Sequence, residues 1–437
     1  MKGKLLALAL VGTVGFSNAA VVENPILKKL VEKGILTEQE AAVIDEQLAK
    51  EEAEKAKYQA EIDKVAMETK EKLDKLNKKI GDMPTLAGKF KKFEIGGKAY
   101  VGYTYTDTKK QYTGNNDKGD FEVRRFYFDT KAYLNDKDHI RFTTDISQSL
   151  NVKGSGNNLS AKDEKLSLKI KYGYLYKDIS SLIPHTGFEL GVAHTPWMDY
   201  EEHSGWWYRS VDKTFIESGG SIGLWPSADL GINFITKTPY ISAEYGIFNG
   251  EGYDKINTSS NKSSGFHNSV EGRLTYHIFG NGNKKLNPTK DQYANISVHL
   301  ASNIGYKDEN TSHKNLNLYH IHAVYNNPMF LLAAQYGKVD YNNSSTLAGD
   351  GYSINGEIRP VQDWAIFGRY DYWSPENKKA TKLDSKKAYY VGVAYTMNKY
   401  VKWIFNYENF DYKDGVAGAN QDKNDKTQYK LTAELSW

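Results

Sequence analysis

Apolar and polar side chains alternate with a period of two along most of the chain, from Phe93 to the last residue. In the final stretch, TQYKLTAELSW, every second residue from Tyr429 to Trp437 is apolar, whereas Lys430 and Glu434 fall on the opposite face. Because successive side chains of a strand point to opposite faces, this spacing predicts strands. A strand with one apolar face suits either a half-buried sheet in water or a wall between lipid and water.

About sixteen runs of this kind follow one another, and their connections alternate in length. Short polar turns such as NDKD, TKTP and TMNK alternate with long polar loops such as KKQYTGNNDKG and KDGVAGANQDKND. This rhythm is typical of an up-and-down barrel in an outer membrane. We therefore predict an all-β fold, a 16-stranded antiparallel transmembrane β-barrel over residues 91–437, with a short N-terminal helical or coiled-coil arm. The predicted strands cover residues 93–106, 120–134, 138–148, 164–178, 187–194, 228–236, 239–249, 268–279, 291–305, 315–325, 328–340, 350–360, 363–373, 386–397, 400–411 and 427–437.

A soluble sandwich or β-helix is the competing interpretation, because alternation can also point apolar residues into a core. Tyrosine and tryptophan gather at predicted strand ends, as in Tyr103–Tyr105, Tyr174–Tyr176 and Tyr370–Trp373. Aromatic belts at the lipid boundary account for this placement, so the pattern favours a membrane barrel. The last strand, which ends on Trp437, is then expected to face lipid in the closing seam of the barrel.

A barrel of sixteen strands is wide enough to leave an aqueous channel, so charges on its inner face are expected to stay solvated without buried partners. In the run 164–178, the alternation places Leu168 and Tyr174 on the face opposite Lys171. The histidines His277, His299, His320 and His322 also fall on inner faces, and a metal site there is conceivable. The predicted lumen cations are Arg125, Arg141, Lys165, Lys169, Lys171, Arg273, Arg359 and Arg369, beside the acids Glu271, Glu357, Asp371 and Glu434.

Residues 1–19 read as a secretory signal peptide, with Lys2 and Lys4 before a short apolar run and small residues at its end. Residues 20–90 form a predicted periplasmic helical arm and linker. Asn24-Pro25 begins a helix that Gly34 ends, and Thr37 with Glu40 can form a capping box for the next helix. A short heptad seam predicts a coiled coil, although a solvated single helix stays open: Ile62, Ala66, Thr69, Leu73, Leu76 and Ile80.

Composition narrows the possible functions. The formal net charge is +3 and lysines and arginines are spread along the chain, so no nucleic-acid partner is expected. The absence of cysteine excludes thiolate chemistry and cysteine-ligated metals. No grouping of serine, histidine and aspartate stands out, and no phosphate-binding glycine loop precedes a helix. We therefore expect no enzyme activity and no cofactor.

One connection, about residues 195–227, is long and carries many aromatic residues, which argues against disorder. We expect this third loop to fold into the pore and narrow it. Its predicted constriction residues are Glu201, Trp206, Trp207, Arg209, Lys213 and Glu217. Arg209 and Lys213 could conduct anions or could simply pair with the carboxylates of the same loop.

The signal peptide, the arm NPILKKLVEKGILTEQEAAVI, sixteen strands, the long third loop and the aromatic last residue together resemble the phosphate-selective porin O and P family. The family's loop pattern is matched at Gly191, Pro196, Trp197, Glu201, Phe215 and Glu217. The resemblance implies a homotrimer with one pore per protomer and the third loop as constriction. The family's arginine ladder cannot be mapped onto this sequence.

We therefore expect an outer-membrane porin, a passive diffusion channel for small hydrophilic solutes and inorganic ions, set in outer-membrane lipid with its arm in the periplasm. Because the predicted lumen charges nearly balance with a slight basic excess, a weak anion preference is expected. Two alternatives stay open. One is a channel specific for phosphate or another oxyanion, and the other is a structural barrel that tethers the envelope through its coiled coil.

Overall fold

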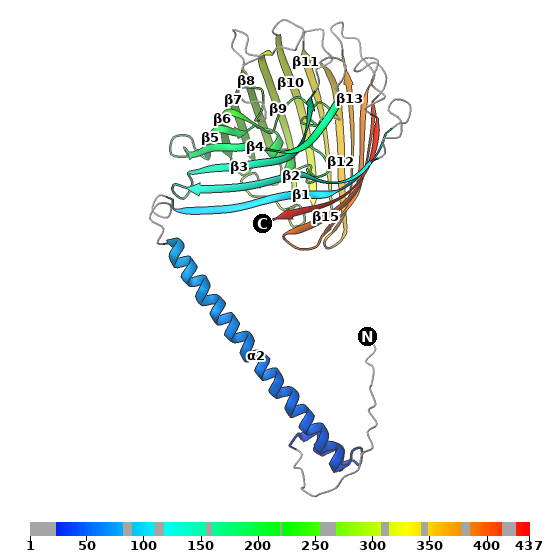
Figure 1. Ribbon diagram of the computed structural model, residues 1–437. Helices are drawn as coiled ribbons and strands as arrows, with labels where there is room; N and C mark the ends of the chain where they lie inside the picture. Colours follow the sequence, from blue (N-terminus) through cyan, green and yellow to red (C-terminus); the bar gives the residue numbers. More distant parts are fainter. Residues whose placement is uncertain are drawn as a thin grey trace. The chain divides into compact units, whose positions relative to one another are not determined.

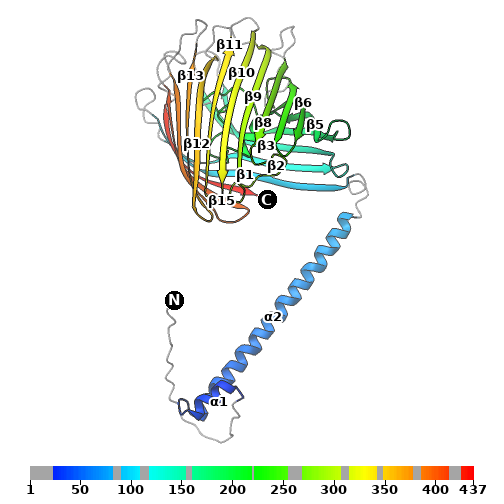
Figure 2. The same cartoon turned by 180° about the vertical axis from the view of Figure 1, so that it is seen from behind.

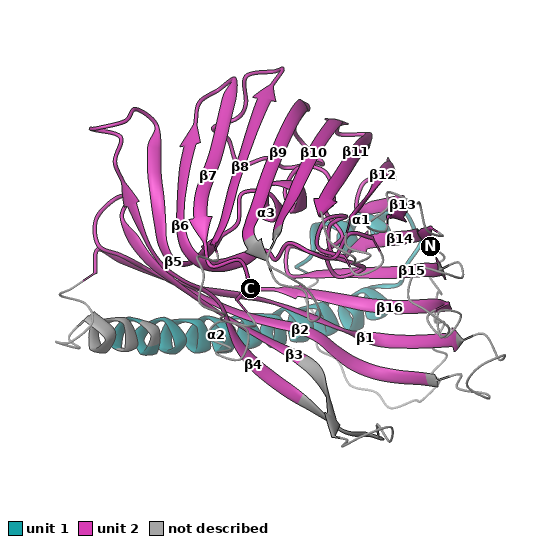
Figure 3. Ribbon diagram, turned by 90° about the horizontal axis from the view of Figure 1, so that it is seen from above, with its two compact units in different colours: residues 1–88 teal, residues 89–437 magenta. Residues whose placement is uncertain are grey.

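The computed structural model describes residues 23–81, 90–108, 118–153, 160–218, 221–253, 268–306, 314–341, 348–376, 385–412 and 425–437. The chain divides into two compact units, residues 1–88 and residues 89–437 (Figure 3). The predicted signal peptide, residues 1–19, lies outside the described residues.

The N-terminal unit contains a short helix, α1 (Pro25–Glu32), and a long helix, α2 (Glu38–Gly81). The side chain of Asn24 accepts a hydrogen bond from the backbone N–H of Ile26, and Gly34 has the positive φ of a helix end. The capping box is confirmed, because the backbone N–H of Thr37 donates to Glu40 Oε2 at 2.9 Å and that of Glu40 donates to Thr37 Oγ1 at 3.3 Å.

None of the helices in the described part of the chain is long and apolar enough to cross a membrane. On the predicted heptad seam of α2, Ile62, Ala66 and Thr69 are exposed in the single chain. The side chains of Leu73, Leu76 and Ile80 lie outside the described residues, so the coiled coil stays a prediction.

The second unit is a closed barrel of sixteen antiparallel strands, as predicted (Figures 1 and 2). Each strand pairs with its neighbours in sequence, and β1 pairs with β16 to close the ring. The strands are β1 (Lys92–Thr108), β2 (Lys118–Tyr133), β3 (His139–Lys153), β4 (Ser160–Asp178), β5 (Thr186–His194), β6 (Ala228–Lys237), β7 (Ile241–Phe248), β8 (Asn268–His277), β9 (Tyr293–Tyr306), β10 (Lys314–Asn327), β11 (Phe330–Tyr341), β12 (Gly349–Val361), β13 (Trp364–Pro375), β14 (Lys386–Thr396), β15 (Val401–Tyr412) and β16 (Lys426–Ser436).

The two faces of the wall have opposite character, as the alternation predicted. On β9, for example, Ile296, Val298 and Leu300 are exposed on the outside, whereas Ser297 and His299 are buried inside. The same inversion continues around the ring, with large apolar side chains outside and polar ones within. A wall of this kind cannot be half of a soluble sandwich, because its apolar face meets no second sheet.

The closing seam is completed by the last residue. The backbone N–H of Trp437 donates to the carbonyl of Gly97, and the N–H of Gly97 donates back to the carbonyl of Trp437, each at 3.2 Å. The indole of Trp437 lies over Gly97 and packs against the ring of Phe126, with 5.3 Å between the ring centroids. Glycine is required at this position because any side chain would occupy the space of the indole.

β-bulges shift the face assignment on two strands. On β4, Thr143 pairs with Tyr172 and Thr144 pairs with Ile170, which leaves Lys171 as the extra residue. From this point on, Tyr172 and Tyr174 face inward, so the predicted place of Tyr174 on the lipid side is wrong. On β2, the extra residue is Arg124, which joins the lumen wall although the sequence analysis did not place it there.

Two further expectations are corrected. Trp373, predicted for an aromatic belt, is buried inside the barrel, because alternation along β13 turns it inward with Asp371. The alternation of long and short connections is also not strict, since residues 278–292 form a long connection among the short turns. That segment is tied down by Asn326, whose side-chain amide donates to the carbonyl of Asp291 at 2.7 Å.

We predict that Gly97→Ala weakens closure of the barrel. The new Cβ would overlap the indole of Trp437 and the carbonyl oxygen of Tyr127, and overpacking of this kind costs about 1–3 kcal/mol. The temperature at which heat converts the compact folded band into the unfolded band on a gel should fall. Gly272→Ala in β8 is the matched control, because its Cβ would meet no atom closer than 3.8 Å. Equal midpoints for the two variants would contradict this account of the seam.

Candidate functional site inside the barrel

The segment 195–227 between β5 and β6, which we call the inner loop, makes its contacts with inward-facing side chains of the wall. It includes a short helix, α3 (Met198–Glu202), which lies within the ring of strands in Figure 3. Near its start, Arg273 Nε on β8 donates to the carbonyl of Pro196 at 2.7 Å. Tyr293 on β9 donates its hydroxyl to the carbonyl of Ser204 at 2.7 Å.

The loop then crosses from β11 to β14, and each strand contributes a polar contact. Gln335 Nε2 on β11 donates to Glu201 Oε1 at 2.7 Å, and Asn355 Nδ2 on β12 donates to the carbonyl of Gly205 at 2.7 Å. On β13, Arg369 Nη1 donates to the carbonyl of Lys213 at 2.6 Å. The hydroxyl of Tyr390 on β14 donates to the carboxylate of Asp212. The contacts to the carbonyls of Gly205 and Lys213 satisfy backbone groups of the loop, and the other two hold its acidic side chains.

Apolar packing holds the inner loop against this half of the wall. Trp197, Trp206 and Trp225 are at most 1% exposed. Trp197 belongs to a cluster with Leu316 and Trp373 of the wall, whereas Trp206 packs with Phe367 and Tyr390 in a second cluster. Burying a large apolar side chain contributes roughly 1.5–3 kcal/mol, so these clusters explain why a long loop has one defined position.

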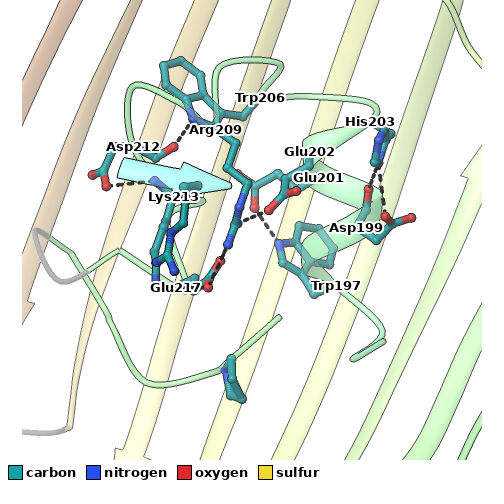
Figure 4. A network of polar contacts seen from close by, with 12 residues as sticks. Trp197, Asp199, Glu201, Glu202, His203, Trp206, Arg209, Asp212, Lys213 and Glu217 are labelled. Carbon is teal, nitrogen blue, oxygen red and sulfur yellow. Dashed lines mark hydrogen bonds and ion pairs between the residues drawn. The ribbon is translucent and has the colours of Figure 1, made fainter. Parts of the chain in front are cut away.

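Three charged residues of the loop, Glu202, Arg209 and Glu217, form a largely buried cluster, which Figure 4 shows together with Lys213. Arg209 lies between Glu202 and Glu217, with 2.7 Å from its Nη1 to Glu217 Oε2. Lys213 adds a second cation, with 3.2 Å from its Nζ to Glu217 Oε1. Burial opposes ionisation of Glu217, but the positive charges of Arg209 and Lys213 overcome it and hold its pKa well below the usual range. Arg209 and Lys213 therefore pair with the carboxylates of their own loop.

Two further loop acids have different surroundings. Glu201 accepts hydrogen bonds from Trp197 Nε1 at 2.6 Å and from Gln335, yet burial raises its pKa to about 6. Asp199 is half exposed and lies 3.3 Å from Nδ1 of His203. The negative charge of Asp199 raises the pKa of His203 to about 9. His203 is therefore an additional loop cation at neutral pH.

Every arginine of the sequence is paired with a carboxylate. The expectation of solvated lumen charges without buried partners is therefore wrong for these residues, because the docked loop and the wall exclude water around them. The pairs are Arg124 with Glu122, Arg125 with Asp145, Arg141 with Asp129, Arg209 with Glu202 and Glu217, Arg273 with Glu244, Arg359 with Glu357, and Arg369 with Asp371.

The inward histidines surround the start of the loop. The indole of Trp197 stacks on His299 with 5.4 Å between ring centroids and meets His320 edge-on at 4.3 Å. His322 lies 5.5 Å away, and His277 instead contacts Ser242 and Asn295. Among the described residues, no group of three or more acids and histidines is arranged to hold a metal ion.

The predicted loop residues lie in one segment, but they make different contacts. Trp206 is packed against the wall, whereas Trp207 is partly buried and donates its indole N–H to Tyr293 at 3.3 Å. Lys169 and Lys171 lie on β4, and the side chain of Lys165 lies outside the described residues. The sequence analysis missed Tyr100, a buried aromatic residue on the polar face of β1. Its position among polar neighbours was the available signal.

Comparison with solved structures returns outer-membrane channels. Salmonella typhi OmpF, solved with daunomycin, has a TM-score of 0.54 at 10% identity and covers 80% of this chain and 99% of its own. OprB of Pseudomonas putida has a TM-score of 0.54 at 9% identity, with coverage of 80% and 95%. The anion-selective porin of Comamonas acidovorans reaches 0.50 at 12% identity, with coverage of 79% and 99%.

The chain has the porin fold. At these identities the likeness concerns the fold alone, and neither a protein-family model nor a curated protein matches the sequence.

We predict that Arg209→Gln loosens the inner loop. Glu202 and Glu217 would stay buried without their shared cation, and removing one partner of a buried pair costs about 3–5 kcal/mol. A denaturant titration followed by tryptophan fluorescence reports the loop, which carries Trp197, Trp206, Trp207 and Trp225. Its midpoint should fall. Lys213→Gln is the control and should cost about 1 kcal/mol or less, because Lys213 is 38% exposed and Arg209 still pairs with Glu217. Equal effects would contradict the central role of Arg209.

We also predict that His203 titrates near pH 9 rather than near its ordinary value of about 6.5. Because its pKa is raised in the folded protein, His203 stabilises the docked loop fully below about pH 6.5, and this contribution is lost as the pH rises through about 9. Ring carbon shifts of labelled histidine, assigned with His203→Gln, measure the titration. Asp199→Asn should return it to about 6.5, and an unchanged midpoint in that variant would refute the assignment.

Proposed function

We propose that this protein is a passive diffusion channel for small hydrophilic solutes and inorganic ions across an outer membrane. The observation that carries the proposal is a closed barrel with an apolar outer face and a polar inner face, crossed inside by a docked loop. The apolar face suits lipid, and the polar face suits a water-filled path. The inner loop is the constriction of this path, and Glu201, Arg209, Lys213 and Glu217 set its charge.

A weak anion preference is the proposed selectivity. The buried arginine pairs are neutral overall, so they contribute little to the potential along the path. Within the loop, Arg209 is balanced by Glu202 and Glu217, and His203 by Asp199. The remaining positive charge comes from lysines of the wall, such as Lys171. A path lined in this way favours anions only slightly.

A channel specific for phosphate or another oxyanion is the second candidate, favoured by the resemblance to the phosphate-selective porins. The paired arginines argue against it, because a guanidinium that already binds a carboxylate has fewer N–H donors left for a phosphate. The homotrimer also rests on that resemblance. The third candidate is an envelope tether that acts through the periplasmic arm, in which the long helix α2 offers Ile62 and Ala66 on an exposed seam.

We predict steady single-channel conductance when the purified protein is inserted in a planar bilayer. Lys213→Gln should shift the reversal potential in a salt gradient toward cation preference, because it removes one charge without unpairing Arg209. The double variant Arg209→Gln/Lys213→Gln should shift it further. An unchanged reversal potential in both variants would count against the constriction assignment.

The same recordings separate the three candidates. Block of the current by added phosphate at concentrations where chloride has no effect would favour the oxyanion-specific channel. Silence of the barrel, together with envelope detachment on deletion of residues 24–80, would favour the tether. The diffusion channel is supported by conductance that persists in that deletion variant and that phosphate does not block.

A further inference from the structure

Lys171 is the one buried lysine among the residues that the structure describes. It is the extra residue of the β4 bulge, which turns both Lys171 and Tyr172 toward the lumen. The side chain is buried, with the residue 5% exposed. Its ammonium lies over the ring of Tyr127, 4.8 Å from the centroid, and 5.3 Å from the centroid of Tyr172. Two ring faces thus hold this cation, and the ring of Tyr172 reaches it because the bulge turns Tyr172 inward.

Within the described part of the chain, no carboxylate lies within ion-pair distance of this ammonium. The charges that act on it from farther away are Arg209, Glu202 and Glu217 of the inner loop and Asp145 of β3. Asp145 is itself bound by Arg125 at 2.7 Å, and Glu217 is shared between Arg209 and Lys213. Lys171 therefore faces carboxylates that already have cations of their own.

The charges around Lys171 do not balance. Four cations, Lys171, Arg125, Arg209 and Lys213, face three carboxylates, Asp145, Glu202 and Glu217. One positive charge is left over, and Lys171 is the cation without a carboxylate. A buried charge is costly unless it is paired. The hydroxyl of Tyr127 is also buried and, among the described residues, has no hydrogen-bond partner, so a second donor on the same cluster is unused.

We propose that Lys171, with Tyr127, binds one small monovalent anion, a halide or a small carboxylate, between the β4 wall and the inner loop. The inference rests on the proposed channel function and names its permeant class. An anion at this point balances the positive charge of Lys171 and accepts a hydrogen bond from the hydroxyl of Tyr127. The site makes Lys171 the residue through which the weak anion preference acts, in place of Arg209, whose charge is already neutralised.

The chemistry of the site favours a monovalent ligand. A divalent oxyanion is best held by several donors at once, above all by the planar forks of arginine. Here both nearby arginines, Arg125 and Arg209, are bound to carboxylates. The ammonium of Lys171 and the hydroxyl of Tyr127 remain, and these two donors suit an anion with a single negative charge.

The test compares wild-type channels with Lys171→Gln and Lys171→Arg in planar bilayers. In wild type, conductance should saturate with rising potassium chloride and with rising potassium acetate, but not with phosphate over the same range. In Lys171→Gln, saturation should disappear and the chloride-to-potassium permeability ratio should fall about fivefold, the effect of about 1 kcal/mol from one charge ~4 Å from the ion in a water-like medium. Lys171→Arg should retain both properties. Lys137→Gln, at the exposed β2–β3 turn, is the charge-matched control and should behave as wild type.

Saturation is measured on the wild-type channel, so the proposed site can be tested even if the Lys171→Gln variant does not fold. Channels whose conductance rises linearly with chloride and acetate would overturn the site and leave the channel function intact, as would a Lys171→Gln channel with an unchanged permeability ratio. Saturation by phosphate at lower concentration than by chloride would overturn the monovalent class. Wild-type protein that forms no channel would overturn the channel function, and the site with it.

Discussion

Closure of the hydrogen-bonded ring is the constraint on which the rest of this structure depends. A strand edge in lipid would leave a row of backbone N–H and carbonyl groups without partners, and only a closed ladder removes every edge. Here the ladder closes where β16 meets β1, and the backbone of Trp437 completes it by exchanging two hydrogen bonds with Gly97. Once the ring is closed, alternation along each strand assigns side chains to the outside or to the lumen, except where the bulges of β2 and β4 shift it.

The inner loop buries its apolar side chains inside the barrel, whereas the strands of the wall turn theirs to the outside. It enters a lumen lined by polar groups, yet it brings apolar residues such as Trp197 and Phe215 that need an apolar partner. The wall supplies that partner at a few inward positions, including Leu316 and Trp373. The polar groups of the wall then bind the backbone of the loop, as Asn355 and Arg369 do. The loop therefore takes its position through apolar packing and hydrogen bonds with the inner face of the barrel.

Burial of the loop determines the electrostatics of the lumen. With water excluded, an unpaired charge is expensive, and Arg209 and Arg369 each lie against carboxylates that neutralise them. The number of charged residues in the lumen is then a poor guide to the potential that an ion meets. What matters is which charges remain after pairing, and Lys171, held by tyrosine rings, is the clearest of these in the described wall.

The sequence alone determined the strands and their order, because a period of two survives in any environment and the turns between strands are local. It also determined the capping box of Thr37 and Glu40, which joins residues three positions apart. Only the tertiary structure decided the bulge at Lys171. The residues before the bulge alternate as in a regular strand, so the sequence does not show that the residues after it exchange faces. The partners of Arg209 and Arg369, likewise, were decided by how the loop docks on strands far away in the chain, and that packing depends on the whole barrel rather than on any local pattern.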